Sequence, residues 1–192
     1  HGSKGMSFSA VKFSSNSKSI FFLSSGMKAS GKESNQIWSL TLSNRVKRKL
    51  TNFEGDISDY DVSDDGKTIA FIGVKNSNKK AANKTPPPIV IDRYQFKRDY
   101  EGFLGSDRDH LFILNTKSRQ IEQITSGQRD HYYPSISPNG ISVAFMAKDG
   151  DFDRHNNWGI FIKDLKVGND PQRLTSSDSE DFSPANASRP QW

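Results

Sequence analysis

The sequence predicts an all-β chain: a partial β-propeller of about three to three and a half four-stranded antiparallel blades. Three observations carry this prediction. A unit of about 49 residues occurs three times, apolar residues alternate with polar ones in short runs, and hydrophobic residues make up only 33% of the 192 residues. A half-solvated sheet buries only alternate residues. Four-stranded units with a period of about 40 to 50 residues are typical of propeller blades.

The first repeated marker is a turn followed by a strand. The three turns begin at Ser14, Ser63 and Ser137, which are 49 and 74 residues apart. Asn, Asp, Pro and Gly in these segments favour a tight β-turn. Period-2 alternation then places two apolar residues of each following strand on one face of a sheet. These pairs are Ile20 with Phe22, Ile69 with Phe71, and Val143 with Phe145.

Two further markers keep the same phase. An apolar strand recurs at 37–40, 111–114 and 160–163, and an aliphatic residue followed by Thr recurs at 50–51, 124–125 and 174–175. Each Thr is followed shortly by an acid, at Asp56, Asp130 and Asp181. The spacings of 74 and about 49 residues place an insertion of about 25 residues in the middle copy.

The repeat divides the chain into blade units. In the middle unit we expect strands near 60–63, 68–74, 110–115 and 120–125. Residues 1–5 look like a tag or linker remnant, and 6–192 form the incomplete propeller. Its expected units are 9–56, 57–130 with the insertion near 75–100, 131–181, and the start of a further blade at 182–192. In such a meander the insertion, the loop 148–157 and the three acids share one end of the blades.

The repeat core resembles the propeller repeats of TolB and of the N-terminal domains of the prolyl oligopeptidase family. Residues 63–71 and 137–145 match the Ser-Pro-Asp-Gly-Lys-x-Ile-Ala-Phe pattern of those repeats nearly letter for letter. The insertion adds a Pro-rich run, an Ile-Asp-Arg stretch and an Asp-x-x-Gly within 86–103, before His110-Leu111-Phe112. This segment resembles dipeptidyl and acylaminoacyl peptidases of that family.

The resemblance implies a serine peptidase with a C-terminal α/β-hydrolase domain and a Ser-Asp-His triad. The propeller would gate access of a peptide substrate and dock the hydrolase domain. These 192 residues contain no Gly-x-Ser-x-Gly nucleophile elbow, so we expect no catalytic residue in this chain. The alternative is a TolB-like propeller that serves as a protein–protein interaction module. A hydrolase domain after Trp192 would favour the peptidase over this alternative.

One cluster stands out as a candidate contact with another domain or partner: Asp92, Arg93 and Tyr94 in the insertion. The competing interpretation is a rigid loop docked on its own blade. The histidines and the acidic loop 149–153 are interpreted as structural and solvated features, because neither shows the spacing of a triad or a calcium loop. The aromatic residues at equivalent strand positions are interpreted as core; they are Phe21, Trp38, Phe112 and Phe161.

Composition excludes several classes. The chain has no cysteine, which excludes a disulfide scaffold and a thiolate metal site. No apolar run approaches the length of a membrane span. The net charge of +5 comes from local lysine groups and is interrupted by acidic runs, so a nucleic-acid partner is not expected. We expect no cofactor or metal. Periplasm and cytoplasm stay open, and a homo-oligomer could cover the open blade flanks.

Overall fold

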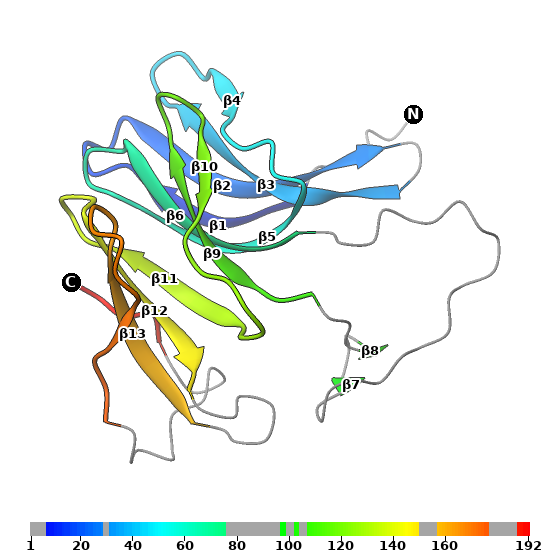
Figure 1. Ribbon diagram of the computed structural model, residues 1–192. Helices are drawn as coiled ribbons and strands as arrows, with labels where there is room; N and C mark the ends of the chain where they lie inside the picture. Colours follow the sequence, from blue (N-terminus) through cyan, green and yellow to red (C-terminus); the bar gives the residue numbers. More distant parts are fainter. Residues whose placement is uncertain are drawn as a thin grey trace.

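The computed structural model describes residues 7–28, 31–75, 97–98, 102–103, 107–149, 157–176 and 188–192. Within this part of the chain every regular element is a β-strand. Three four-stranded antiparallel meanders follow one another and fan out side by side (Figure 1). The prediction of an all-β chain built from four-stranded blades is therefore confirmed.

Blade 1 contains strands in the order β1-β2-β3-β4, which are β1 (Ser7–Phe13), β2 (Ser19–Lys28), β3 (Gly31–Thr41) and β4 (Lys47–Lys49). Blade 2 contains β5 (Gly55–Val62), β6 (Thr68–Lys75), β9 (His110–Asn115) and β10 (Ile121–Gln123). Blade 3 contains β11 (His131–Ile136), β12 (Ser142–Lys148), β13 (Trp158–Asp164) and β14 (Gln172–Arg173). A small hairpin lies between β6 and β9, with strands β7 (Lys97–Arg98) and β8 (Gly102–Phe103).

The first strand of blade 2 begins earlier than the expected range 60–63. It starts at Gly55, and its pairing with β6 shifts between Ile57 and Asp59. The same irregularity occurs in β1 and β11. A bulge inserts an extra residue and breaks the period-2 pattern, which is why alternation alone missed this part of the strand. The last strand is shorter than the expected 120–125.

The repeated turns share one hydrogen-bonding scheme. In blade 2 the Ser63 hydroxyl donates to the Asp65 carboxylate at 2.8 Å and accepts the amide of Thr68 at 3.1 Å. Blades 1 and 3 have equivalent bonds. The turn needs a left-handed residue, supplied by Gly66 and Gly140 at φ 67° and 69°, but by Ser17 at φ 54° in blade 1. Glycine adopts this conformation without steric cost and serine does not.

Each blade has two faces: a leading face toward the preceding blade in the chain and a trailing face toward the following one. The leading face carries the predicted apolar pairs and packs on the preceding blade: Ile69 and Phe71 contact blade 1 residues, and Val143 and Phe145 contact blade 2 residues. The trailing face packs on the following blade. Its members in blades 1 and 2 are Phe21, Leu23, Ile37, Leu50, Phe53, Ala70, Ile72 and Leu111.

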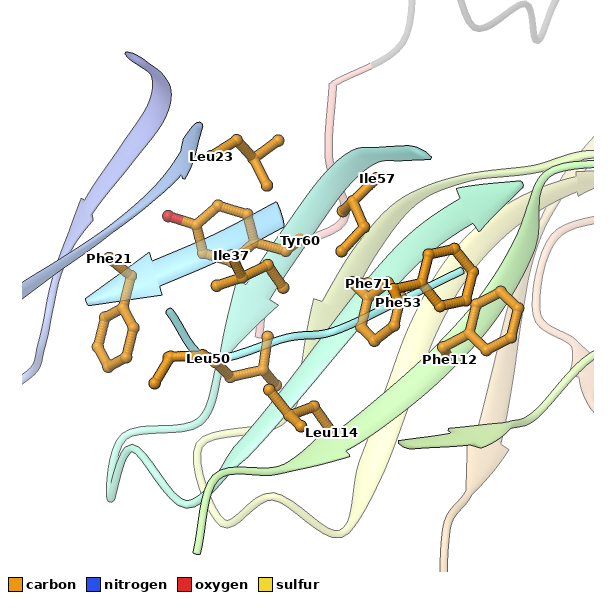
Figure 2. Close-up of a cluster of buried hydrophobic side chains, with 11 residues drawn as sticks. Phe21, Leu23, Ile37, Leu50, Phe53, Ile57, Tyr60, Phe71, Phe112 and Leu114 are labelled. Atoms are coloured by element: carbon orange, nitrogen blue, oxygen red, sulfur yellow. The ribbon is translucent and has the colours of Figure 1, made fainter. Parts of the chain in front are cut away.

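The core between blades 1 and 2 is rich in aromatic rings (Figure 2). Phe71 and Phe112 stack with centroids 5.2 Å apart, and Phe53 meets both edge-on at 5.3 and 4.8 Å. Phe21, Phe112 and Phe161 are buried, as predicted for core residues. Trp38 is half-buried, and the Lys47 ammonium lies 5.1 Å from the centre of its ring.

Candidate functional site

The acids that follow each repeated Thr are structural ties. The Asp56 carboxylate accepts the amide of Asn35 at 2.5 Å, and Asp130 accepts the amide of Asp109 at 3.1 Å. Asp56 lies near the start of β5 and Asp130 directly before β11, and each accepts an amide within or directly before the third strand of the preceding blade. Asp56 and Asp130 thus lie at the same end of their blades, as expected. Asp181 lies outside the described residues.

The repeated Thr residues make a second tie at this end. In every blade the hydroxyl oxygen accepts the amide of an equivalent residue of the third strand. The pairs are Thr51 with Ile37, Thr125 with Leu111, and Thr175 with Ile160, at 2.9, 2.9 and 3.1 Å. Since backbone groups buried in a sheet must be paired, these threonines hold the blade framework.

A pocket of about 700 Å³ opens at this end of blades 2 and 3. Three carboxylates, Asp56, Asp59 and Asp109, and the rings of Tyr132 and Tyr133 contribute to its wall. Ser58, Ile72, Val74, Ser188 and Arg189 complete the lining. The first strands of the two blades, β5 and β11, thus supply a mixed polar and aromatic surface.

Arg189 neutralises part of this acidic wall. Its Nη2 lies 2.5 Å from the Asp59 carboxylate, and its Nη1 donates to the carbonyls of Tyr60, at 3.2 Å, and of Pro134. The guanidinium group is only partly exposed, where charge-assisted hydrogen bonds are strong. A single side chain near the end of the chain therefore connects the first strands of blades 2 and 3.

Tyr60 and Asp61 connect all three blades along their first strands, β1, β5 and β11, which are called the inner strands below. The Tyr60 hydroxyl donates to the Ala10 carbonyl at 2.6 Å. Asp61 accepts from Lys12 Nζ of blade 1 at 2.6 Å and from the amide of Ile136 of blade 3 at 2.9 Å. Burial, with the charges of Asp59 and Asp61 nearby, raises the pKa of Tyr60 well above its usual range. The phenol therefore stays protonated and keeps donating.

Two histidines lie at the same end, with ring centres 5.4 Å apart. His131 is buried, and its Nδ1 lies 2.9 Å from the carbonyl of Asp109. Burial lowers the pKa of His131 to about 4 and also lowers the pKa of His110. A backbone carbonyl orients His131, and the His110 Nδ1 lies 3.5 Å from the Thr125 hydroxyl. Among the described residues neither ring has the serine and carboxylate partners of a triad. Both belong to the blade framework, and His155 lies outside the described residues.

Asp149, the described member of the acidic loop, is engaged in ion pairs. Its carboxylate lies 2.8 Å from Arg173 Nη1 and 3.5 Å from Arg129 Nη1. Asp151 and Asp153 lie outside the described residues. Within the described ranges no group of three or more histidine and acidic side chains is placed to hold a metal ion.

The predicted contact cluster Asp92, Arg93 and Tyr94 lies outside the described residues, so it stays a prediction. The structure instead brings together residues that the sequence did not single out: Asp61, Tyr60 and Arg189. Arg189 could have been found by aligning Arg189-Pro190 with Tyr133-Pro134, which marks it as the start of another inner strand. In the described part of the chain there is no helix long and apolar enough to cross a membrane.

Comparison with known proteins gives one related sequence and many related folds. No family model matches the chain. An uncharacterized peptidase, YuxL of Bacillus subtilis, is 26% identical over 118 residues, which is 58% of this chain. The chain spans only 18% of that peptidase's length.

Solved structures with the same fold include peptidases and TolB. An acylaminoacyl peptidase of Pyrococcus horikoshii matches 88% of this chain over 25% of its own length (17% identity, TM-score 0.64). A putative TolB of Agrobacterium tumefaciens matches 90% of this chain over 50% of its own length (19% identity, TM-score 0.58). The β-propeller domain of the Trilobed protease of Pyrococcus furiosus matches 86% of this chain over 42% of its own length (13% identity, TM-score 0.54). The fold of this chain is therefore a partial β-propeller, similar to those of peptidases and of TolB.

Proposed function

We propose that this chain is the non-catalytic propeller portion of a prolyl-oligopeptidase-like serine peptidase. It gates the access of peptide substrates and docks the α/β-hydrolase domain of the longer protein that carries it. The observation that carries the proposal is the sequence match to a peptidase over 118 residues in a chain with propeller blades. Because the sequence has no nucleophile elbow, the proposal places the catalytic residues in another part of that protein.

The inner strands are suited to gating because they are joined across blades. Asp61 holds β5 to both neighbours, and Arg189 adds a second link between blades 2 and 3. A peptide that passes along these strands would meet the pocket with its carboxylates and tyrosines. Rigid spacing of the blades would then limit the width of a substrate that can pass.

The test uses the longer protein and two matched variants. Asp61→Ala removes a carboxylate that joins three blades, and Asp65→Ala removes one that serves only its local turn. We expect the Asp61 variant to cleave longer polypeptides faster while cleavage of a short chromogenic peptide is unchanged. The Asp65 variant should behave like the parent. Equal effects of both variants on long substrates would contradict gating by the blades.

Docking is proposed for Asp92, Arg93 and Tyr94. In the longer protein, Arg93→Ala should lower the temperature at which the two domains separate, as measured by calorimetry. The same substitution should leave the unfolding temperature of the isolated 192-residue chain unchanged. A loss of stability in the isolated chain would instead indicate a loop that is docked on its own blade.

The second candidate is a TolB-like interaction module, supported by the match of 90% of the chain to a putative TolB. The two candidates differ in what accompanies the propeller. A longer protein with no hydrolase domain, which does not react with a fluorophosphonate, would favour the interaction module.

A further inference from the structure

The charges in the pocket between blades 2 and 3 do not balance. Asp56, Asp59 and Asp109 contribute three carboxylates, whereas Arg189 is the only basic residue among the described residues of the lining. Arg189 Nη2 lies 2.5 Å from the Asp59 carboxylate, so these two charges offset each other. Within the described part of the chain, the Asp56 carboxylate accepts only the amide of Asn35, which does not neutralise it. The described wall therefore favours a cationic ligand.

Two adjacent tyrosines line the same pocket because β11 contains a bulge. In a regular strand, neighbouring side chains point to opposite faces of the sheet. The pairing of β11 with β12 shifts between Tyr132 and Ser135, and both Tyr132 and Tyr133 line the pocket. Their ring centres lie 6.4 Å apart, and Tyr132 packs edge-on against Trp158 at 5.4 Å. A bulge can re-aim a side chain in this way next to a functional site.

Tyr133 holds its position at a conformational cost. Its φ is 53°, in the left-handed region that bulky residues rarely adopt. Ala10 occupies the equivalent place in the bulge of β1, four residues before the repeated serine, and has φ 49°. The bulge therefore forms without a large side chain at this position. Strained residues cluster at ligand sites, so the second ring points to binding rather than to folding.

We propose that this pocket binds the side chain of an arginine residue in a peptide. A guanidinium group is planar, pairs with carboxylates and stacks on aromatic faces. The same surroundings already hold one guanidinium group, because Arg189 donates to Asp59 and to the carbonyls of Tyr60 and Pro134. The volume of about 700 Å³ is typical of a small-ligand site and accommodates a whole side chain with neighbouring backbone.

The described lining supplies each contact that the guanidinium group needs. Asp56 provides the carboxylate, and Tyr132 and Tyr133 provide the ring faces. The inference rests on the proposed function in one respect, since it takes the ligand to be a peptide. It names the class of peptide that the inner strands would recognise, namely one that contains arginine.

The test measures the affinity of the purified 192-residue chain for three short peptides by isothermal titration calorimetry. The peptides are acetyl-Gly-Gly-Arg-Gly-amide and its counterparts with citrulline or lysine in place of arginine. Acetylation removes the terminal ammonium group, so the side chain is the only cation. Citrulline is neutral but has nearly the shape of arginine, and its peptide should bind about tenfold more weakly. The lysine peptide should bind about threefold more weakly, because an ammonium group lacks the planar fork.

A matched pair of variants tests the charge. Asp56→Asn removes the charge but keeps an oxygen that can accept the Asn35 amide. It should weaken binding of the arginine peptide about tenfold and leave binding of the citrulline peptide unchanged. Asp65→Asn is the control, since Asp65 bonds only within its own turn. This control should bind all three peptides like the parent.

A second matched pair separates binding from folding. Tyr133→Gly removes one ring, and glycine adopts φ 53° without strain. The variant should therefore keep the bulge and unfold at about the same urea concentration as the parent, but bind the arginine peptide about fivefold more weakly. Ala10→Gly makes the same backbone change in blade 1, outside the described lining. It should leave the affinity unchanged.

Several results would overturn the proposal. These are equal affinity for the arginine and citrulline peptides, no binding of the arginine peptide, and an Asp56→Asn variant that binds like the parent. Equal affinity for the arginine and lysine peptides would overturn the assignment of a guanidinium group. None of these measurements depends on cleavage. The comparison of Asp61→Ala with Asp65→Ala in the longer protein therefore tests gating separately, and the failure of either proposal can be told from the failure of the other.

Discussion

Replacing Asp61 should loosen the joint between all three blades. Its carboxylate accepts from Lys12 Nζ at 2.6 Å and from the amide of Ile136 at 2.9 Å. The side chains of Lys12 and Asp61 are 29% and 19% exposed. Asp61→Ala leaves the Ile136 amide without its acceptor and Lys12 without its counter-ion, while Asp61→Asn can still accept from the amide.

The two contacts differ in expected size. A hydrogen bond to a charged acceptor contributes about 1.5 to 3 kcal/mol, and a partly exposed ion pair contributes about 0.5 to 1 kcal/mol. Asp61→Ala should therefore lower the free energy of unfolding by about 2 to 4 kcal/mol. Asp61→Asn, which loses mainly the ion pair, should cost about 1 kcal/mol.

Urea unfolding followed by far-UV circular dichroism measures both values. Lys12→Met combined with each Asp61 variant completes a double-mutant cycle, which isolates the energy of the ion pair from that of the amide bond. The reasoning is refuted if Asp61→Ala changes the free energy of unfolding by less than about 0.5 kcal/mol, the usual range for surface substitutions. Equal losses for the Ala and Asn variants would refute the assignment of the larger share to the Ile136 amide.

Four further substitutions test the blade framework by urea unfolding. Ser17→Gly should raise the free energy of unfolding by about 0.5 to 1 kcal/mol, and Gly66→Ala should lower it by about 1 to 2 kcal/mol, because both turns need a residue with positive φ. A lower free energy of unfolding for both variants would contradict this. Thr125→Val removes the acceptor of the Leu111 amide and should lower the free energy of unfolding by about 1 to 3 kcal/mol. An unchanged free energy of unfolding would contradict a stabilising role of this hydrogen bond. In the unfolded chain His131 takes up a proton near its usual pKa, whereas in the folded chain its pKa is lowered to about 4. Stability should therefore fall by up to about 3 kcal/mol as pH drops from about 6.5 to 4, and His131→Gln should remove most of this slope.

The sequence predicted the blades because the repeat is a local and redundant signal. Each turn, alternating strand and Thr supports the same phase, and the structure pairs those strands within one blade. Period 2 groups Ile69 with Phe71, and Val143 with Phe145, on one face of a sheet, but only the structure shows that this face packs on the preceding blade. The bulge near Ile57 could not be predicted, because one inserted residue shifts the pattern without a distinctive composition.

The contacts between blades could not be read in the same way. The acidic run from Asp59 to Asp65 looks like a solvated segment, yet the structure gives its members different partners. Asp59 pairs with Arg189, Asp61 with Lys12, and Asp65 with its own turn. These partners lie between 2 and 130 residues away in the chain, and only the arrangement of the blades brings the distant ones together. The predicted contact at Asp92, Arg93 and Tyr94 stays a prediction because these residues lie outside the described part of the chain.

The division between a propeller and a separate catalytic domain is tested most directly by assaying the purified 192-residue chain. Aminoacyl and acyl-peptide chromogenic substrates are incubated with the chain, with and without a fluorophosphonate. We predict no turnover, since the sequence has no nucleophile elbow and the described histidines are held in the blade framework. Hydrolysis that the fluorophosphonate abolishes would place a reactive serine in this chain and contradict the account.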